Sequence, residues 1–288
     1  MDIIYRFDPY AKIEPKPSPA PEDAIGMLER GHRRYDQAVT RIQEEMKKGP
    51  GGEPVSIVIE ADPLRVGFSR ASGVPEHTPY ALVLGCSDAR VPVERIFDQS
   101  PNDLFVLRVA GNVLGTECLG SIDYAVRNLG NSLRLLVVLG HSNCGAVSAA
   151  VDLYLTPQDY PVLGLTHSLR SLVDRILIAV RGASRAIERV YGGDASEQPG
   201  FRAAMIETSV FLNAALTAFD VRREVDLCPG DGPRPKVVYG VFDIATQTVR
   251  SRPGGGDDEI LGVVADNPAD LEKLGERFRR AAVERHMK

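Results

Sequence analysis

Short apolar runs alternate with helically spaced stripes along the middle of this chain. Three runs, at 80–85, 104–110 and 133–140, are almost wholly apolar, and two of them end in glycine. Such runs are typical of strands that are buried on both faces of a sheet. Helical spacing separates the second run from the third, at 117–130, and follows the third at 145–155. The alternation of strand, helix and strand predicts a parallel sheet with right-handed crossovers.

The flanking segments extend this pattern to an α/β fold. Proline-rich residues 1–20 predict an extended arm, and Pro21 begins a helical stripe that the glycines of 49–52 end. Alternation at 236–243 and 246–251 predicts a hairpin at the sheet edge. The other predicted elements are a short strand at 56–60, long helices at 164–190 and 201–226, and a charged helix at 267–286. The predicted fold class is therefore α/β, with a central mostly parallel sheet flanked by helices and an antiparallel edge strand.

Composition narrows the class of protein. The 288 residues are 43 % hydrophobic and 25 % charged, with a formal net charge of −5, which is ordinary for a globular protein. No basic stripe is present, so we expect no nucleic-acid partner. No apolar run approaches the ~18 residues of a membrane-spanning helix, and the acidic N-terminus lacks the apolar stretch of a signal peptide. We therefore expect a cytoplasmic protein with no membrane partner.

Two predicted strands end in residues that bind soft metals. Cys86 follows the run 80–85, and His141 follows the run 133–140. The carboxyl ends of parallel strands meet at one edge of a sheet, where ligands gather, and Cys144 lies three residues beyond His141. Two thiols and one imidazole favour zinc. Three protein ligands leave a fourth position open, which is the pattern of a catalytic zinc.

Two alternatives stay open for this cluster. Cys118 would complete a four-ligand structural zinc if the fold brought it close. Otherwise the cysteines are unligated core thiols, which are common, and His141 is a strand-end histidine. We expect Cys118 and Cys228 to be buried free thiols, His32 and His167 to be structural or surface residues, and His286 to be solvated.

Asp88 and Arg90 lie just beyond Cys86. Two thiolates neutralise a zinc dication, so a bound water should be a weaker acid than the pKa of about 7 known for three-histidine zinc. Asp88 either takes the fourth position or accepts a hydrogen bond from that water. Arg90 holds the carboxylate in a fork of two hydrogen bonds. Without the metal, this pair reads as an ordinary loop ion pair.

The motif C-x-D-x-R at Cys86, Asp88 and Arg90, with H-x-x-C at His141 and Cys144, resembles the β-class carbonic anhydrases. The likeness covers roughly residues 22–250 and is densest over 80–150. It implies a zinc lyase in which a metal-bound hydroxide attacks carbon dioxide to give bicarbonate. Cys86, His141 and Cys144 would hold Zn²⁺, and Asp88 and Arg90 would form a catalytic dyad.

The resemblance also implies partners, a substrate pocket and a domain plan. Members of the family form homodimers or assemblies of dimers, with the active site near the subunit interface. By position, Phe105 and Tyr124 resemble apolar residues that meet the substrate, although both are equally consistent with plain core aromatics. We expect an arm at 1–20, a β-carbonic anhydrase-like catalytic domain at 21–252, and a C-terminal extension with a helix at 253–288.

Three features depart from the family pattern. His77 stands where the family often has a glutamine that hydrogen-bonds the substrate; a histidine there would donate a similar bond, relay protons, or be an exposed loop residue. Val83 stands where bicarbonate-inhibited members have a tryptophan, and the chain has no tryptophan. The connection at 50–76 and the tail at 253–288 are longer than usual. Two alternative functions therefore remain: carbon disulfide or carbonyl sulfide hydrolysis on the same zinc site, and a non-catalytic zinc- or bicarbonate-binding protein.

Overall fold

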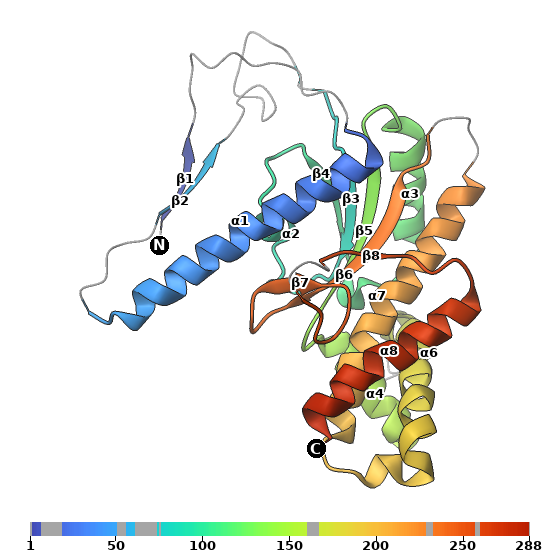
Figure 1. The fold of residues 1–288 in the computed structure, drawn as a ribbon. Coiled ribbons are helices and arrows are strands. Elements are labelled where there is room, and N and C mark those ends of the chain that lie inside the picture. Colours follow the sequence, from blue (N-terminus) through green and yellow to red (C-terminus); the bar gives the residue numbers. More distant parts are fainter. Residues whose placement is uncertain are drawn as a thin grey trace.

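The computed structural model describes residues 2–6, 19–50, 56–60, 74, 76–159, 167–228, 233–256 and 260–287. Its centre is a six-stranded sheet in the order β4-β3-β5-β6-β7, with β8 also paired to β6 (Figure 1). The strands are β3 (Ala81–Gly85), β4 (Leu104–Arg108), β5 (Leu135–His141), β6 (Lys236–Asp243), β7 (Thr248–Arg250) and β8 (Gly262–Val263). The first four are parallel, whereas β7 and β8 run antiparallel to β6. The predicted mostly parallel sheet with an antiparallel edge strand is confirmed.

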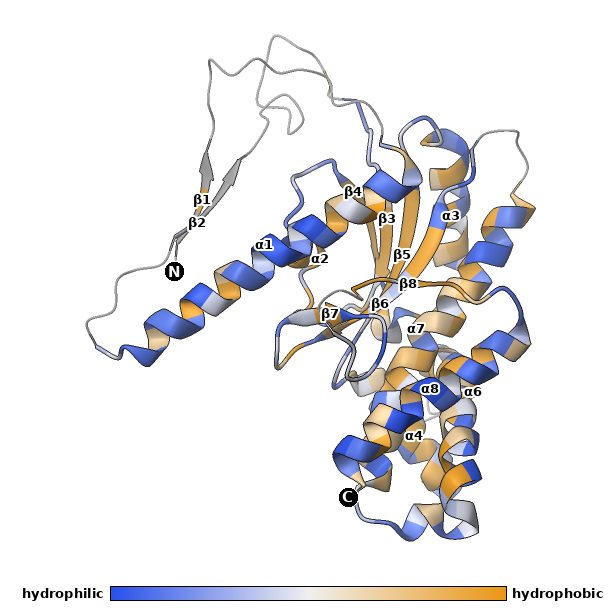
Figure 2. Cartoon of the chain, viewed as in Figure 1, coloured by the Kyte–Doolittle hydropathy of each residue, from blue (hydrophilic) through white to orange (hydrophobic). Residues whose placement is uncertain are grey.

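Helices cover both faces of this sheet, and side chains alternate between two buried clusters. In β3, Leu82 and Leu84 join one cluster, and Ala81 and Val83 join the other. The second cluster lies under α1 (Pro21–Lys47) and α2 (Val93–Ile96). The first cluster lies under α3 (Thr116–Asn128), α4 (Gly145–Leu155), α6 (His167–Tyr191), α7 (Phe201–Leu227) and α8 (Pro268–His286). Burial of every strand residue of β3 and β5 explains their continuous apolar sequence (Figure 2).

The N-terminal region adds a second sheet. β1 (Asp2–Arg6) and β2 (Ser56–Glu60) pair in parallel, so part of the predicted arm is a strand. Much of the arm and of the long connection, at 7–18 and 61–73, lies outside the described residues. Short 3-10 segments join the larger elements at η1 (Ala110–Asn112), η2 (Pro157–Asp159) and η3 (Gly192–Glu197). The division of the chain into three parts stays a prediction.

The ends of α1 and α8 carry the expected helix signals. Pro21 occupies the first turn of α1, with Glu22 and Asp23 beside it, where acids favour the positive end of the helix dipole. In α8, the Asn267 side chain accepts a hydrogen bond from the Asp270 backbone N–H, which satisfies one orphan donor of the first turn. The helix from Pro21 was predicted from its proline and apolar stripe and the C-terminal helix from its amphipathic spacing, and both are present in the structure.

The buried ring of His32 fastens α1 to the sheet. Its Nε2 accepts a hydrogen bond from the Val249 backbone N–H (2.9 Å), and its Nδ1 lies 3.0 Å from the Ile96 carbonyl oxygen. The prediction that His32 is structural is confirmed, because these bonds join α1, α2 and β7.

Replacing His32 by alanine is therefore expected to lower the free energy of unfolding by about 1–3 kcal/mol, since buried partners lose their hydrogen bonds. Chemical denaturation of the variant, compared with His167→Ala at an exposed position of α6, measures this difference. Equal stability of the two variants would contradict the fastening role.

α7 is the central helix of the molecule. By length and composition it is apolar enough to cross a membrane, but 72 % of its most apolar window is buried inside the protein. A buried core helix passes the same test, so this is weak evidence for a membrane. The predicted C-terminal helix packs against the same core, because Leu271, Phe278, Ala282 and Val283 are buried in the first cluster.

Candidate metal centre

Adjacent strand ends bring Cys86, His141 and Cys144 together. β3 pairs with β5 so that Gly85 lies opposite Leu139; the next residues on each strand are therefore neighbours at the carboxyl edge. β3 connects onward to β4 on one side and β5 to β6 on the other, and such a switch point opens a crevice. The two sulfurs and one ring nitrogen lie within 4.8 Å of one another, and all three residues are buried.

The donor atoms fit a zinc ion. His141 Nδ1 donates a hydrogen bond to the Ser142 carbonyl oxygen (2.9 Å), which leaves Nε2 as the free lone pair. That Nε2 is buried and has no hydrogen-bond partner, an arrangement that costs free energy unless a ligand completes it. Tetrahedral zinc with Zn–S bonds of about 2.3 Å needs ligand atoms roughly 3.8 Å apart, which the cluster accommodates. A carbonyl acceptor on the far ring nitrogen is the usual outer partner of a zinc histidine.

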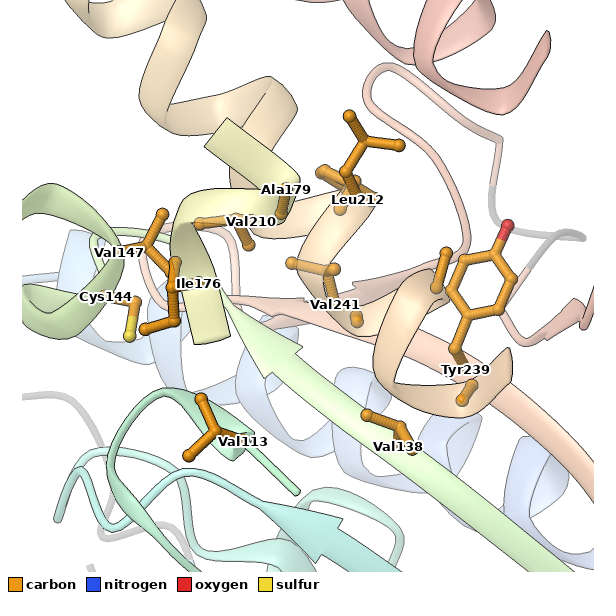
Figure 3. Packing of buried hydrophobic residues seen from close by; sticks show 14 of the residues in the cluster. Val113, Val138, Cys144, Val147, Ile176, Ala179, Val210, Leu212, Tyr239 and Val241 are labelled. Atoms are coloured by element: carbon orange, nitrogen blue, oxygen red, sulfur yellow. The ribbon is translucent and has the colours of Figure 1, made fainter. Parts of the chain in front are cut away.

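Apolar side chains surround the thiol of Cys144. Val113, Val147 and Ile176 belong to the buried cluster that contains this sulfur, and they lie around it in Figure 3. Cys144 is the N-cap residue of α4, and backbone N–H groups of Val147 and Ala146 lower the pKa of its thiol, although other causes outweigh them. A dry, amide-lined pocket of this kind favours thiolate bound to a cation over free thiolate.

Without a metal the two thiols compete for one proton. A hydrogen bond between Cys86 and Cys144 is the largest cause of both shifts: it lowers the pKa of the Cys86 thiol and raises the pKa of the Cys144 thiol. The second thiolate therefore forms reluctantly beside the first. A dication at the same position would compensate both charges, so the thiols are poised for metal binding.

A second layer of backbone and side-chain contacts fixes Cys86. The Gly111 backbone N–H donates to Cys86 Sγ (3.3 Å), and the Asn213 side-chain N–H donates to the Gly111 carbonyl oxygen (2.8 Å). Gly111 has a φ of 68°, a conformation that favours glycine. Sequence reasoning missed Asn213, because its partner is 102 residues away.

Replacing Asn213 by alanine is expected to weaken zinc affinity by about tenfold to a hundredfold, as for other outer-layer partners of metal ligands. Asn213 is 4 % exposed and holds the loop whose N–H reaches the sulfur. Competition with a zinc chelator measures the change, with Asn128→Ala as the control, because Asn128 makes a similar side-chain-to-carbonyl bond on exposed α3. Equal zinc affinity in both variants would remove Asn213 from the metal centre.

Asp88 and Arg90 form the predicted fork. Arg90 Nε donates to Asp88 Oδ1 (2.9 Å) and Arg90 Nη2 to Oδ2 (2.6 Å). These bonds hold the pKa of the Asp88 carboxyl well below its usual range. Asp88 Oδ2 also lies 3.9 Å from His141 Nε2, so the carboxylate borders the metal position. Arg108 donates to the carbonyl oxygens of Cys86 and Asp88 and thereby fixes the loop.

The three predicted pocket residues lie in different surroundings. The rings of His77 and Phe105 stack with centroids 5.8 Å apart, so these two side chains lie together. Phe105 pairs with Leu82 in the sheet, four residues before Cys86, and His77 is exposed. Tyr124 is 52 % exposed on α3. A substrate role for His77, Phe105 and Tyr124 stays a prediction.

The other cysteines and histidines lie outside the cluster. Within the part of the chain that the structure describes, only Cys86, His141 and Cys144 form such a group, so the alternative with Cys118 as fourth ligand is not supported. Cys118 and Cys228 are free thiols as expected, although Cys118 is only half-buried. His286, expected to be solvated, instead contacts Glu207 (2.8 Å), because α8 folds back onto α7.

Comparison with known proteins agrees with this geometry. A family model described as carbonic anhydrase matches residues 81–211. "Carbonic anhydrase 2" of Mycobacterium tuberculosis (strain CDC 1551 / Oshkosh) is 50 % identical over 82 residues, which are 28 % of this chain and 39 % of that protein. "Carbonic anhydrase" of Mycolicibacterium smegmatis is 50 % identical over 83 residues, 29 % of this chain and 39 % of that protein. The chain thus matches well under two thirds of the length of these curated relatives.

Among solved structures, the β-carbonic anhydrase of Coccomyxa in complex with acetazolamide aligns with a TM-score of 0.45 and 21 % identity, covering 64 % of this chain and 75 % of that one. The matched segment contains the three metal-site residues and the Asp88–Arg90 fork. Residues 81–211, less than half of the chain, are therefore similar in sequence to carbonic anhydrases.

Proposed function

We propose that this protein catalyses the reversible hydration of carbon dioxide to bicarbonate at a zinc ion held by Cys86, His141 and Cys144. The observation that carries the proposal is the buried, partnerless Nε2 of His141 beside two thiols and an arginine-fixed carboxylate. The match of residues 81–211 to the carbonic anhydrase family model supports the same reaction.

When bound, zinc would act as a Lewis acid that lowers the pKa of a water molecule so that it attacks carbon dioxide. The two thiolates cancel the charge of the dication, so this water should ionise at a higher pH than at three-histidine zinc. Asp88 would accept a hydrogen bond from such a water and so orient it toward the substrate. Arg90 keeps Asp88 ionised and holds both of its oxygens.

The same proposal extends to the surroundings of the site. His77 and Phe105 form part of the substrate pocket, with Tyr124 contributing from α3. The chain works as a homodimer or an assembly of dimers in the cytoplasm, with residues 21–252 as its catalytic domain. The exposed positions of His77 and Tyr124 fit a pocket that a second subunit completes.

Stopped-flow measurement of carbon dioxide hydration across pH tests the proposal on protein loaded with about one zinc per chain. Activity is expected to rise toward alkaline pH, because the site must lose a proton from water whose pKa lies above about 7. Full zinc occupancy without activity would instead support a non-catalytic zinc- or bicarbonate-binding protein. Turnover of carbon disulfide or carbonyl sulfide alone would support the sulfur-analogue hydrolase.

A further inference from the structure

A cavity of about 360 Å³ lies between the end of α8, the first turns of α7 and the β6–β7 hairpin. This volume is within the range of small-molecule sites, which start at about 300 Å³. Its lining includes Ser142 and Asn143, the two residues between the metal-site side chains His141 and Cys144. The cavity is therefore next to the metal-site loop, but it is lined by none of the three metal-site residues.

One wall of this cavity is apolar. Val210 and Phe211 on α7 and Val241 on β6 are buried residues of the main core that also line the cavity. Val210 and Val241 face one another across the α7–β6 packing in Figure 3. Ile206, one turn earlier on α7, extends the same wall. The wall offers a surface for the hydrophobic body of a ligand.

The lining also carries charged side chains, and most of them already have partners. Arg202 forms two hydrogen bonds with the Asp152 carboxylate (2.7 and 2.8 Å). Glu207 pairs with both Arg285 (2.6 Å) and His286 (2.8 Å) at the end of α8. Arg202, Arg285 and His286 therefore already have carboxylate partners.

Arg250 also lines the cavity but, unlike these residues, has no carboxylate partner among the described residues. It lies opposite Val241 in the β6–β7 ladder, and cross-strand partners share a face of the sheet, so its side chain is directed toward α7. Its Nε is buried without a hydrogen-bond partner, and among the described residues its side chain forms no ion pair. The lining carboxylate of Asp243 is engaged elsewhere, by the Ser142 hydroxyl (3.1 Å) and the Ala245 backbone N–H (2.9 Å). A buried guanidinium N–H without an acceptor costs free energy, and an anion in the cavity would supply that acceptor.

The end of α8 packs closely against the residue that precedes α7. Gly200, just before α7, has a φ of 80°, and a Cβ there would lie 1.9 Å from the His286 carbonyl oxygen. The end of α8 therefore lies directly against the start of α7, and this packing holds Arg285 and His286 in the lining of the cavity.

We propose that this cavity binds a small organic anion, with its charged group on the Arg250 guanidinium and its apolar body against Val210, Phe211 and Val241. The ligand class is a carboxylate, sulfonate or phosphate that carries a hydrophobic group. The site is distinct from the metal centre but touches it through Ser142, whose carbonyl accepts the His141 Nδ1 hydrogen bond.

Binding of two fluorescent probes tests the proposal on the full-length, zinc-loaded protein. 1-Anilinonaphthalene-8-sulfonate carries an anion on an apolar body, and N-phenyl-1-naphthylamine is the same body without the charge. Arg250→Gln is expected to raise the dissociation constant of the sulfonate about tenfold or more, since a charged hydrogen bond is lost, and to leave the neutral probe unchanged. Arg280→Gln is the matched control, because Arg280 is exposed on α8 outside the cavity.

A variant that fills the cavity tests whether both probes bind inside it. Ala203 lines the cavity from α7, so Ala203→Phe should abolish binding of both probes while every charge is retained. Excess benzoate should displace the sulfonate from the unmodified protein. Equal sulfonate affinity in the unmodified protein, Arg250→Gln and Ala203→Phe would show adventitious surface binding and overturn the proposal. Because the measurement reads binding alone, its result is independent of carbon dioxide hydration.

Discussion

Replacing Cys144 by alanine is expected to reduce zinc from about one ion per chain to nearly none, and to abolish carbon dioxide hydration. Cys144 supplies one of the three donor atoms that lie within 4.8 Å of one another, and two remaining protein ligands bind zinc far more weakly than three. Metal analysis of the dialysed protein measures the first effect, and stopped-flow hydration measures the second.

The thermal unfolding temperature should also fall in Cys144→Ala, because a ligand that binds only the folded state stabilises it by mass action. Chelation of zinc from the unmodified protein should lower that temperature by a similar amount. Agreement between the two shifts would show that both report loss of the same ion.

Cys118→Ala is the control for this experiment, and it also tests the four-ligand alternative. Cys118 is a half-buried free thiol on α3, outside the cluster. Its replacement should leave zinc content and activity unchanged. Zinc loss in Cys118→Ala, or zinc retention in Cys144→Ala, would contradict the three-ligand centre.

Asp88→Asn is expected to lower the hydration rate by about 10²- to 10⁴-fold, the usual contribution of a positioned acid–base group, without loss of zinc. Asparagine keeps the size of the side chain but removes the anion that accepts a hydrogen bond from the water. Asp88 lies beside the metal position, 3.9 Å from His141 Nε2, without being part of the three-residue cluster. Asp123→Asn breaks a comparable Asp–Arg pair on exposed α3 and should retain full activity.

The pH dependence separates Asp88 from the attacking water. Arg90 hydrogen bonds hold the pKa of Asp88 far below its usual value of about 3.9, so Asp88 stays ionised through the whole alkaline rise. In Arg90→Gln the pKa of Asp88 should return toward that value, and an additional loss of activity should appear as the pH falls toward it. An unchanged acid profile in Arg90→Gln would show that Arg90 does not control the ionisation of Asp88.

The metal-site residues could be predicted from the sequence because they lie at or just beyond the ends of apolar segments that are typical of buried strands. Cys86 and His141 end apolar runs that had to be buried strands, and parallel strands bring their carboxyl ends to one edge. The helices at 21–47 and 268–286 were predictable for the same kind of reason, since proline, capping and apolar spacing act within a few residues. Short elements such as α2 and η1 carried no such pattern and were missed.

Residues that act through distant partners were not predictable. Asn213 reaches Gly111 only because α7 packs across the sheet, and the cavity beside Arg250 exists only because α8 folds back onto α7. The sequence pattern of His32 does not distinguish it from other helical histidines. Its structural role is visible only in the hydrogen bonds that join α1, α2 and β7. Each of these contacts joins positions far apart in the chain.

The short-range sequence pattern thus determined the strands, the longer helices and the residue types at the metal centre. Hydrophobic periodicity and turn chemistry act over only a few residues. Packing decided which side chains support that centre, which cations are neutralised and where a cavity is left. Those outcomes depend on distances between segments, which sequence spacing does not encode.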